Sequence, residues 1–148
     1  MEPIIDALRQ LLANGETYLK SAAESELRQP YAPGKWSRKQ VIGHLIDSAL
    51  NNLQRFTEIH GLPQPYVYRE YRQDELVAIN RYHDMDTSDL MQLWLSLNRQ
   101  ILWVMATVTE PQLERQVLMP DGTRTNLRYL MQDYPHHLAH HLQQIISK

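Results

Sequence analysis

Apolar side chains recur every three or four residues in four separate stretches of the chain, and the positions between them are mostly polar. This spacing is typical of amphipathic helices that bury one face in a common core. It predicts four helices, over residues 3–27, 37–59, 87–108 and 125–146. The second has the clearest start, because Ser37 and Gln40 stand at the two positions of a capping box, directly after Trp36.

Residues 60–86 form a long connection between the second and third predicted helices. Pro63 and Pro65 prevent a helix at its start, whereas residues 74–82 can form a short one. A connection of this length lets the two helices that it joins run parallel to each other. The turn sequence MPDGTR separates the third helix from the fourth. The pattern predicts an all-α fold: one domain of residues 1–148, a four-helix bundle with a long crossover between helices two and three.

Composition and charge narrow the classes of function. Lys and Arg number 15 and Asp and Glu number 17, so the net charge of −2 gives no basic footprint for nucleic acid. The absence of cysteine excludes disulfides, thiolate zinc sites and cysteine nucleophiles. The chain shows no secretory signal at its start, and no apolar run reaches the roughly 18 residues of a membrane span. We therefore expect a cytoplasmic protein that binds neither nucleic acid nor membranes.

The stretch DYPHHLAHHLQQI places four histidines within six positions of the last predicted helix. At about 100° of rotation per residue, His141 and His137 lie about −60° and about −100° from Leu138, beside the apolar stripe. His136 and His140 point to the opposite side. Two histidines one turn apart on the same face can share a metal ion. The helix therefore has an inner pair of candidate ligands and an outer pair that we expect to be solvated.

A metal site with an open position needs a third protein ligand. His44 in the second helix is the natural candidate, since it lies away from the apolar stripe, on a face shared with Asp47, Ser48, Asn51 and Arg55. Residue chemistry alone leaves two alternatives for this face, which is either solvated or the wall of a polar cleft. We expect His60 and His83 to be ordinary surface or capping residues.

The segments WSRKQVIGHLIDSA, around His44, and DYPHHLAHHLQQI resemble the sequence pattern of the DinB/YfiT-like family of metal-dependent enzymes. NRYHDMDTSDLMQLWLSLNRQIL also resembles the family's third helix, so the likeness extends over most of the chain from Trp36 onward. The resemblance implies an up-down-down-up four-helix bundle and one divalent metal ion held by His44, His137 and His141. Pro135 puts that geometry in doubt, because a proline inside the last helix can kink it and displace His137.

The resemblance also implies two activities on small electrophilic substrates. One is transfer of a low-molecular-weight thiol such as bacillithiol, mycothiol or glutathione, and the other is metal-dependent hydrolysis. All-nitrogen ligation favours zinc or nickel. Asp47 and Gln144, each about one turn from a ligand, are candidates to orient the imidazoles. Arg55, and Arg69 and Arg72 in the long connection that would cover the site, are candidates to pair with carboxylates of the thiol.

Two other interpretations stay open. The protein is either a non-catalytic, stress-response bundle whose metal ties the second helix to the fourth, or a metal-free bundle in which the histidines are ordinary. The metalloprotease motif H-E-x-x-H is absent. The sequence does not determine the substrate, the native metal or the oligomeric state, and a homodimer is one of the options.

Overall fold

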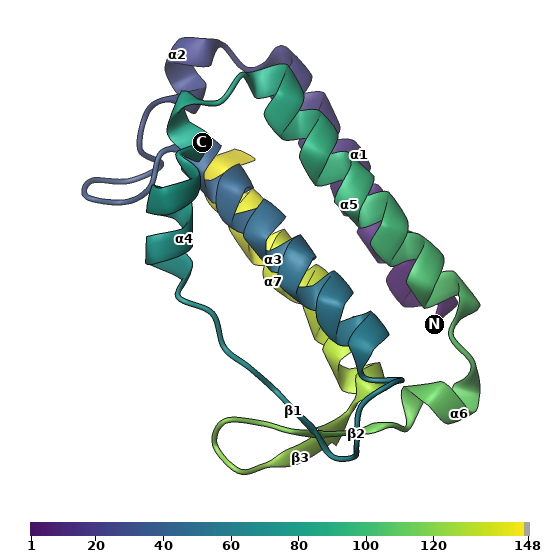
Figure 1. The fold of residues 1–148 in the computed structure, drawn as a ribbon. Helices are drawn as coiled ribbons and strands as arrows, with labels where there is room; N and C mark the ends of the chain where they lie inside the picture. The colour runs from purple at the N-terminus through teal and green to yellow at the C-terminus, as the bar shows by residue number, and fades with distance from the viewer. Residues whose placement is uncertain (147–148) are drawn as a thin grey trace.

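Four long helices form the body of the molecule, and the computed structural model describes residues 1–146 (Figure 1). The helices are α1 (Glu2–Ser21), α3 (Arg38–Glu58), α5 (Thr87–Thr107) and α7 (Leu127–Ile146). Both α1 and α3 pack against α5 and α7, so the four surround one core. Figure 1 shows that α1 and α7 run in one direction and α3 and α5 in the other. This order confirms the up-down-down-up four-helix bundle.

The first helix is shorter than its apolar pattern predicts, and the prediction of one helix over residues 3–27 is wrong. Helix α1 ends at Ser21, Ala22 and Ala23 are extended, and a separate turn, α2, covers Glu24–Leu27. The break redirects the chain so that Leu27 is buried in the core and Glu24 faces the starts of α3 and α5.

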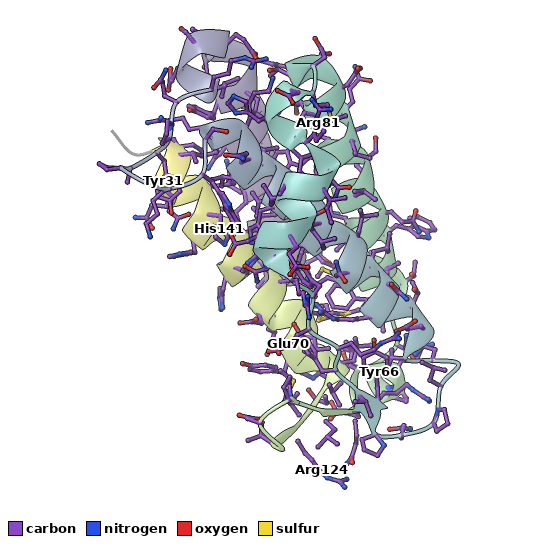
Figure 2. All side chains as sticks on the ribbon, turned by 60° about the vertical axis from the view of Figure 1, so that its left-hand side comes forward. Tyr31, Tyr66, Glu70, Arg81, Arg124 and His141 are labelled. Carbon is purple, nitrogen blue, oxygen red and sulfur yellow. The ribbon has the colours of Figure 1, made fainter. Side chains whose placement is uncertain are left out.

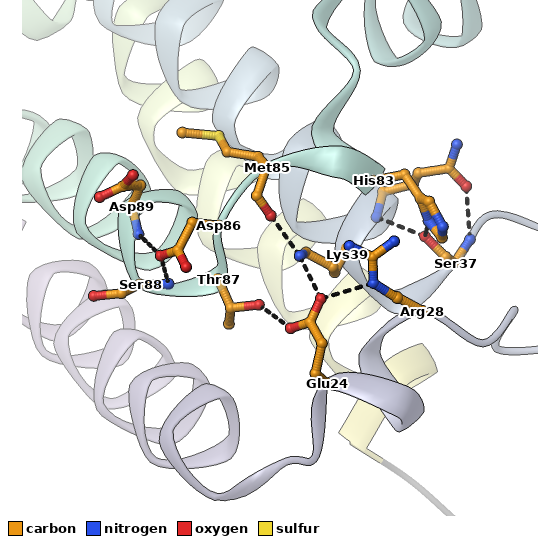
Figure 3. Close-up of polar contacts among 11 residues, drawn as sticks. Glu24, Arg28, Ser37, Lys39, His83, Met85, Asp86, Thr87, Ser88 and Asp89 are labelled. Carbon is orange, nitrogen blue, oxygen red and sulfur yellow. Dashed lines mark hydrogen bonds and ion pairs between the residues drawn. The ribbon is translucent and has the colours of Figure 1, made fainter.

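Glu24 compensates a buried charge at this end of the bundle (Figure 3). The side chain of Lys39 is only 1% exposed, and its ammonium group lies 2.8 Å from a carboxylate oxygen of Glu24. The same ammonium donates a hydrogen bond to the carbonyl of Met85, and the hydroxyl of Thr87 donates to Glu24. This ion pair and the Thr87 hydrogen bond thus join α2 to α3 and to the start of α5, and the turn after Ser21 places Glu24 where it makes both contacts.

The start of α3 has the predicted capping box. The Ser37 hydroxyl accepts from the backbone N–H of Gln40, and the Gln40 side chain accepts from the backbone N–H of Ser37. The Ser37 hydroxyl also lies 2.9 Å from Nδ1 of His83, so this half-buried histidine takes part in the cap. The observed helix agrees with the predicted one to within a residue at each end.

The crossover between α3 and α5 contains the short elements β1, α4 and η1, which cover Tyr66–Val67, Gln73–Asn80 and Tyr82–Asp84. Helix α4 confirms the short helix predicted near residues 74–82, and it ends where Arg81 takes a left-handed conformation with φ of 52°. Both α4 and η1 pack on α3. The Tyr82 ring lies so close to Gly43 that a side chain there would collide with it. The crossover therefore lies directly over one face of α3.

A small sheet closes the other end of the bundle and was not predicted. The short helix α6 and the strands β2 and β3 cover Glu110–Leu113, Gln116–Leu118 and Arg124–Asn126. Strand β2 pairs in parallel with β1 and antiparallel with β3, across the predicted MPDGTR turn, where Gly122 has φ of 85°. Because residues 124–126 pair as a strand, α7 begins two residues later than expected. Within residues 1–146, no helix combines the length and hydropathy needed to cross a membrane.

Candidate metal centre

Three histidines from two helices converge between α3 and α7, where His44 is buried and the other two are half-buried. His44 comes from α3, and His137 and His141 come from α7, one turn apart. One nitrogen from each imidazole lies within 4.8 Å of the other two. These are the three residues that the helical spacing and the family resemblance select. Helix α7 continues without interruption through Pro135, so the proline does not keep His137 from reaching His44.

The distances from Nε2 of His44 to the other two imidazoles fit ligands of a single tetrahedral metal ion. Zinc–imidazole bonds of about 2.0–2.1 Å at the tetrahedral angle hold the ligand nitrogens about 3.3–3.4 Å apart. Nε2 of His44 lies 3.2 Å from Nε2 of His137 and 3.2 Å from Nε2 of His141. The trio thus offers three corners of a coordination tetrahedron and leaves the fourth to another ligand.

The surroundings keep these imidazoles in the neutral form that binds metals. Burial, and then the neighbouring imidazoles of His141 and His137, lower the pKa of His44 to about 3. Burial, followed by His141 and His140, lowers the pKa of His137 to about 4. The pKa of His141 is also lowered, again mainly by burial. A neutral ring has a lone pair free for coordination, so little proton release would accompany metal binding at neutral pH.

Side chains next to the trio contact the ring nitrogens on the far side from Nε2. The Gln144 carbonyl oxygen lies 2.9 Å from Nδ1 of His141, and because that oxygen only accepts, it places the proton on Nδ1 and leaves Nε2 free. The Ser48 hydroxyl lies 3.4 Å from Nδ1 of His137, a partner that the sequence analysis did not identify. Nδ1 of His44 is buried and has no hydrogen-bond partner among residues 1–146. The Trp36 ring packs beside the His44 ring, with 5.0 Å between the two ring centres.

Asp47 does not orient His44, contrary to expectation. Its Oδ1 accepts hydrogen bonds from the Tyr82 hydroxyl at 2.6 Å and from the Asn80 amide at 3.0 Å. Its Oδ2 is buried and has no partner within the described chain. Burial raises the pKa of this carboxyl, although the Tyr82 and Asn80 hydrogen bonds lower it. Asp47 therefore fixes the crossover on α3, and no sequence pattern links it to Tyr82, which lies 35 positions away.

The remaining histidines lie outside the cluster. His136 and His140 are exposed, in agreement with the helical count, and Nε2 of His140 lies near the Gln144 amide nitrogen. His60 is half-buried, and burial lowers its pKa. His83 belongs to the Ser37 cap.

The face of α3 that carries His44 is a buried polar wall, which decides between the two alternatives left by the sequence. His44, Asp47, Ser48 and Arg55 are all at most 3% exposed. Beside them a cavity of about 140 Å³ lies between α3, α7 and the crossover. Its lining includes His137 and Tyr134 from α7, Ser48 and Arg55 from α3, and Tyr68 and Tyr71 from the crossover. The cavity therefore reaches one of the candidate metal ligands.

The three arginines considered for substrate binding lie in different environments. Arg69 and Arg72 are exposed and pair with Glu58 and Glu75, at 2.9 and 3.0 Å. Arg55 lines the cavity, and its guanidinium stacks 4.0 Å from the centre of the Tyr68 ring. Figure 2 shows Tyr66 and Glu70 of the crossover near the end of the bundle that carries the hairpin, and His141 further along α7.

The chain belongs to the DinB superfamily, whose profile matches residues 7–145. It is 25% identical to "Putative metal-dependent hydrolase YfiT" of Bacillus subtilis over 142 residues, which cover 95% of this chain and 79% of that protein. A second relative, from Halalkalibacterium halodurans, also has the name "putative metal-dependent hydrolase" and is 29% identical over 125 residues. That match covers 84% of this chain and 72% of the relative.

Solved structures share the bundle topology. The structure of Bacillus subtilis YfiT, described as a four-helix bundle of unusual topology, matches with a TM-score of 0.87 and 25% identity, over 97% of this chain and 82% of YfiT. A mycothiol-dependent maleylpyruvate isomerase matches with a TM-score of 0.78 and 14% identity, over 98% of this chain and 60% of the isomerase. The second likeness concerns the fold alone.

Proposed function

We propose that the protein is a metal-dependent enzyme in which His44, His137 and His141 hold one zinc or nickel ion. The observation that carries the proposal is the convergence of three neutral imidazoles beside a cavity, with Nε2 of His44 3.2 Å from Nε2 of both His137 and His141. Three nitrogen ligands from imidazoles suit these two metals. Such an ion, when bound, lowers the pKa of a coordinated thiol or water and polarises an electrophilic substrate.

The residues of the chain have separate tasks in this proposal. The three histidines supply the ligands, and Gln144 fixes the proton of His141 on Nδ1 so that Nε2 points inward. The crossover residues Tyr68 and Tyr71 cover the cavity and restrict water around the site. Because the chain has no cysteine, a reacting thiol has to come from a small-molecule cosubstrate.

Two reactions are compatible with this arrangement, and the relatives point to both. The names of the two relatives describe metal-dependent hydrolases, in which water is the nucleophile. The isomerase with the same fold depends on the thiol mycothiol. We place thiol transfer first, since the cavity extends well beyond His137 to Arg55 and so has room for a cosubstrate larger than water.

A purely structural metal is the second candidate, and one observation favours it. His44 is fully buried, and a metal there would tie α3 to α7 as a cross-link. The cavity next to His137 distinguishes the candidates, because a structural site has all its positions filled by protein.

The test combines a metal measurement with a reaction. Elemental analysis of protein purified without an affinity tag should give about one metal ion per chain. The metal-loaded protein is then mixed with a small alkyl halide, with and without a panel of small thiols. His44→Ala should abolish product formation, whereas His136→Ala, the matched control on the exposed face of α7, should retain it.

The outcomes separate the alternatives. Metal-dependent conjugates that need the thiol support transfer, and product formed without thiol supports hydrolysis. If the protein binds one metal ion per chain but forms no product with any thiol of the panel, the result supports a structural metal. Equal metal content in the wild type and in His44→Ala contradicts the site itself.

A further inference from the structure

Among the residues that the structure describes, the buried cation Arg55 has no carboxylate partner. The residue is 3% exposed, and its guanidinium donates to the backbone carbonyl of Arg69 at 2.6 Å and to the Asn52 side-chain oxygen at 3.3 Å. The rings of Tyr68 and Tyr71 lie 4.0 and 5.6 Å from its central carbon. Within residues 1–146, no carboxylate oxygen lies within 4.0 Å of its nitrogens.

This environment offsets the burial of a charge only in part. A buried guanidinium normally has a carboxylate beside it, because the loss of hydration costs several kcal/mol by order of magnitude. A carbonyl, an amide oxygen and an aromatic face each recover a fraction of that loss. The exposed Arg69 and Arg72, which need a partner far less, both have one. An anion is the element missing around Arg55.

The position of Arg55 relative to the histidines indicates where that anion belongs. Arg55 and Ser48 line the same cavity as His137, and Ser48 contacts the His137 ring. Arg55 follows Ser48 by seven residues, which is about 10 Å along the helix axis. The Arg55 guanidinium donates to Asn52, which lies one turn nearer to Ser48, so it is directed toward the N-terminal part of α3 that carries Ser48 and His44. One small molecule can therefore span the distance from the histidines to Arg55.

The other walls of the cavity restrict the chemistry of this molecule. Asp133 also lines the cavity, and Glu70 lines the adjoining space next to Arg55. These two carboxylates disfavour a ligand with several negative charges. Tyr68, Tyr71 and Tyr134 supply aromatic surface for the body of the ligand. The cavity suits a flexible organic molecule with one carboxylate several bonds away from its reacting end.

We propose that Arg55 is a specificity-determining residue that binds the carboxylate of the thiol cosubstrate, whose sulfur lies at the three histidines. The inference rests on the proposed function for the position of the sulfur, whereas the anion site at Arg55 stands on its own environment. The fork of the guanidinium makes two parallel hydrogen bonds to a carboxylate. A thiol of equal length that ends in a hydroxyl group lacks this pairing.

The first experiment compares two thiols of equal length, mercaptohexanoate and mercaptohexanol, by calorimetric titration of the metal-loaded protein. If a charge-assisted pair forms, the wild type should bind mercaptohexanoate about tenfold to about a hundredfold more tightly than mercaptohexanol. Arg55→Met should remove this preference. Arg72→Met, a matched change of an exposed arginine in the crossover, should retain it. Equal affinities in the wild type, or a preference that survives in Arg55→Met, would overturn the proposal.

A second measurement needs neither bound metal nor a variant in which an uncharged residue replaces Arg55. In metal-free wild-type protein, hexanoate should shift the Nε–H nuclear magnetic resonance signal of Arg55, and hexanol should not. Arg55→Lys keeps the buried charge, identifies the signal by its loss and should weaken the binding of mercaptohexanoate. If hexanoate shifts the Arg55 signal but the protein does not bind metal, the anion site at Arg55 is supported and the proposed function is contradicted. If excess hexanoate leaves the Arg55 signal unshifted, the anion site is refuted, whether or not the protein binds metal.

Discussion

Metal binding at the three histidines should stabilise the fold by an amount that depends on which histidine is replaced. The site joins α3 to α7, and the unfolded chain does not hold His44 beside His137 and His141. A metal ion that binds only the folded state raises the free energy of unfolding by RT ln(1 + [M]/Kd). At a thousandfold excess over Kd this is about 4 kcal/mol, which corresponds to a rise of about 8–16 °C in Tm for a chain of this size.

His137→Ala removes one of the three nitrogens, and the matched control His140→Ala removes an exposed imidazole from the same helix. If the lost ligand weakens binding about a hundredfold, the same metal concentration adds only about 1.4 kcal/mol, or about 3–6 °C. The control should keep the full increase. Thermal unfolding by circular dichroism, with zinc and then with a chelator, measures both. The reasoning fails if His137→Ala and His140→Ala show the same zinc-dependent rise in Tm.

Three further predictions concern stability, each measured by urea unfolding. Glu24→Gln should destabilise the fold by about 1–3 kcal/mol, because the buried Lys39 ammonium loses its counter-charge. The hydrogen bond from Lys39 is the main cause that lowers the pKa of the Glu24 carboxyl to about 2. The difference in the free energy of unfolding between the wild type and Glu24→Gln should therefore be full at a pH above the ordinary pKa of a glutamate, and it should shrink as the pH falls toward 2. Gly43→Ala should cost about 1–3 kcal/mol, since the new methyl group meets the tyrosine ring packed on α3. Tyr134→Phe leaves the buried oxygen of Asn98 without its 2.7 Å hydrogen bond and should cost about 1–3 kcal/mol, and no loss would contradict that account.

The features that could be predicted from the amino-acid sequence are those that depend on local geometry. Apolar spacing located the four long helices, and the Ser37 box placed the start of α3 to within one residue. The rotation per residue in a helix is fixed, so counting residues sorted His137 and His141 from His136 and His140 before any packing was known. The need for a third ligand and the polar face of the second helix then pointed to His44, and the resemblance agreed with that choice and with the parallel run of the second and third helices. Each of these rests on positions a few residues apart or on a motif.

The burial of polar groups, and the partners that they find, became evident only from the packing of distant segments. Periodicity showed that the His44 face of α3 is polar, but the packing of α7 and the crossover against it makes that face an interior wall. Asp47 pairs with Tyr82, and the Arg55 guanidinium stacks on Tyr68, through contacts that no local pattern encodes. The turn after α1 brings Glu24 to Lys39, which lies 15 positions further along the chain, and the strands of two or three residues are too short to show a period. Helical repetition is a property of neighbouring residues, whereas burial depends on segments that meet only once the chain has folded.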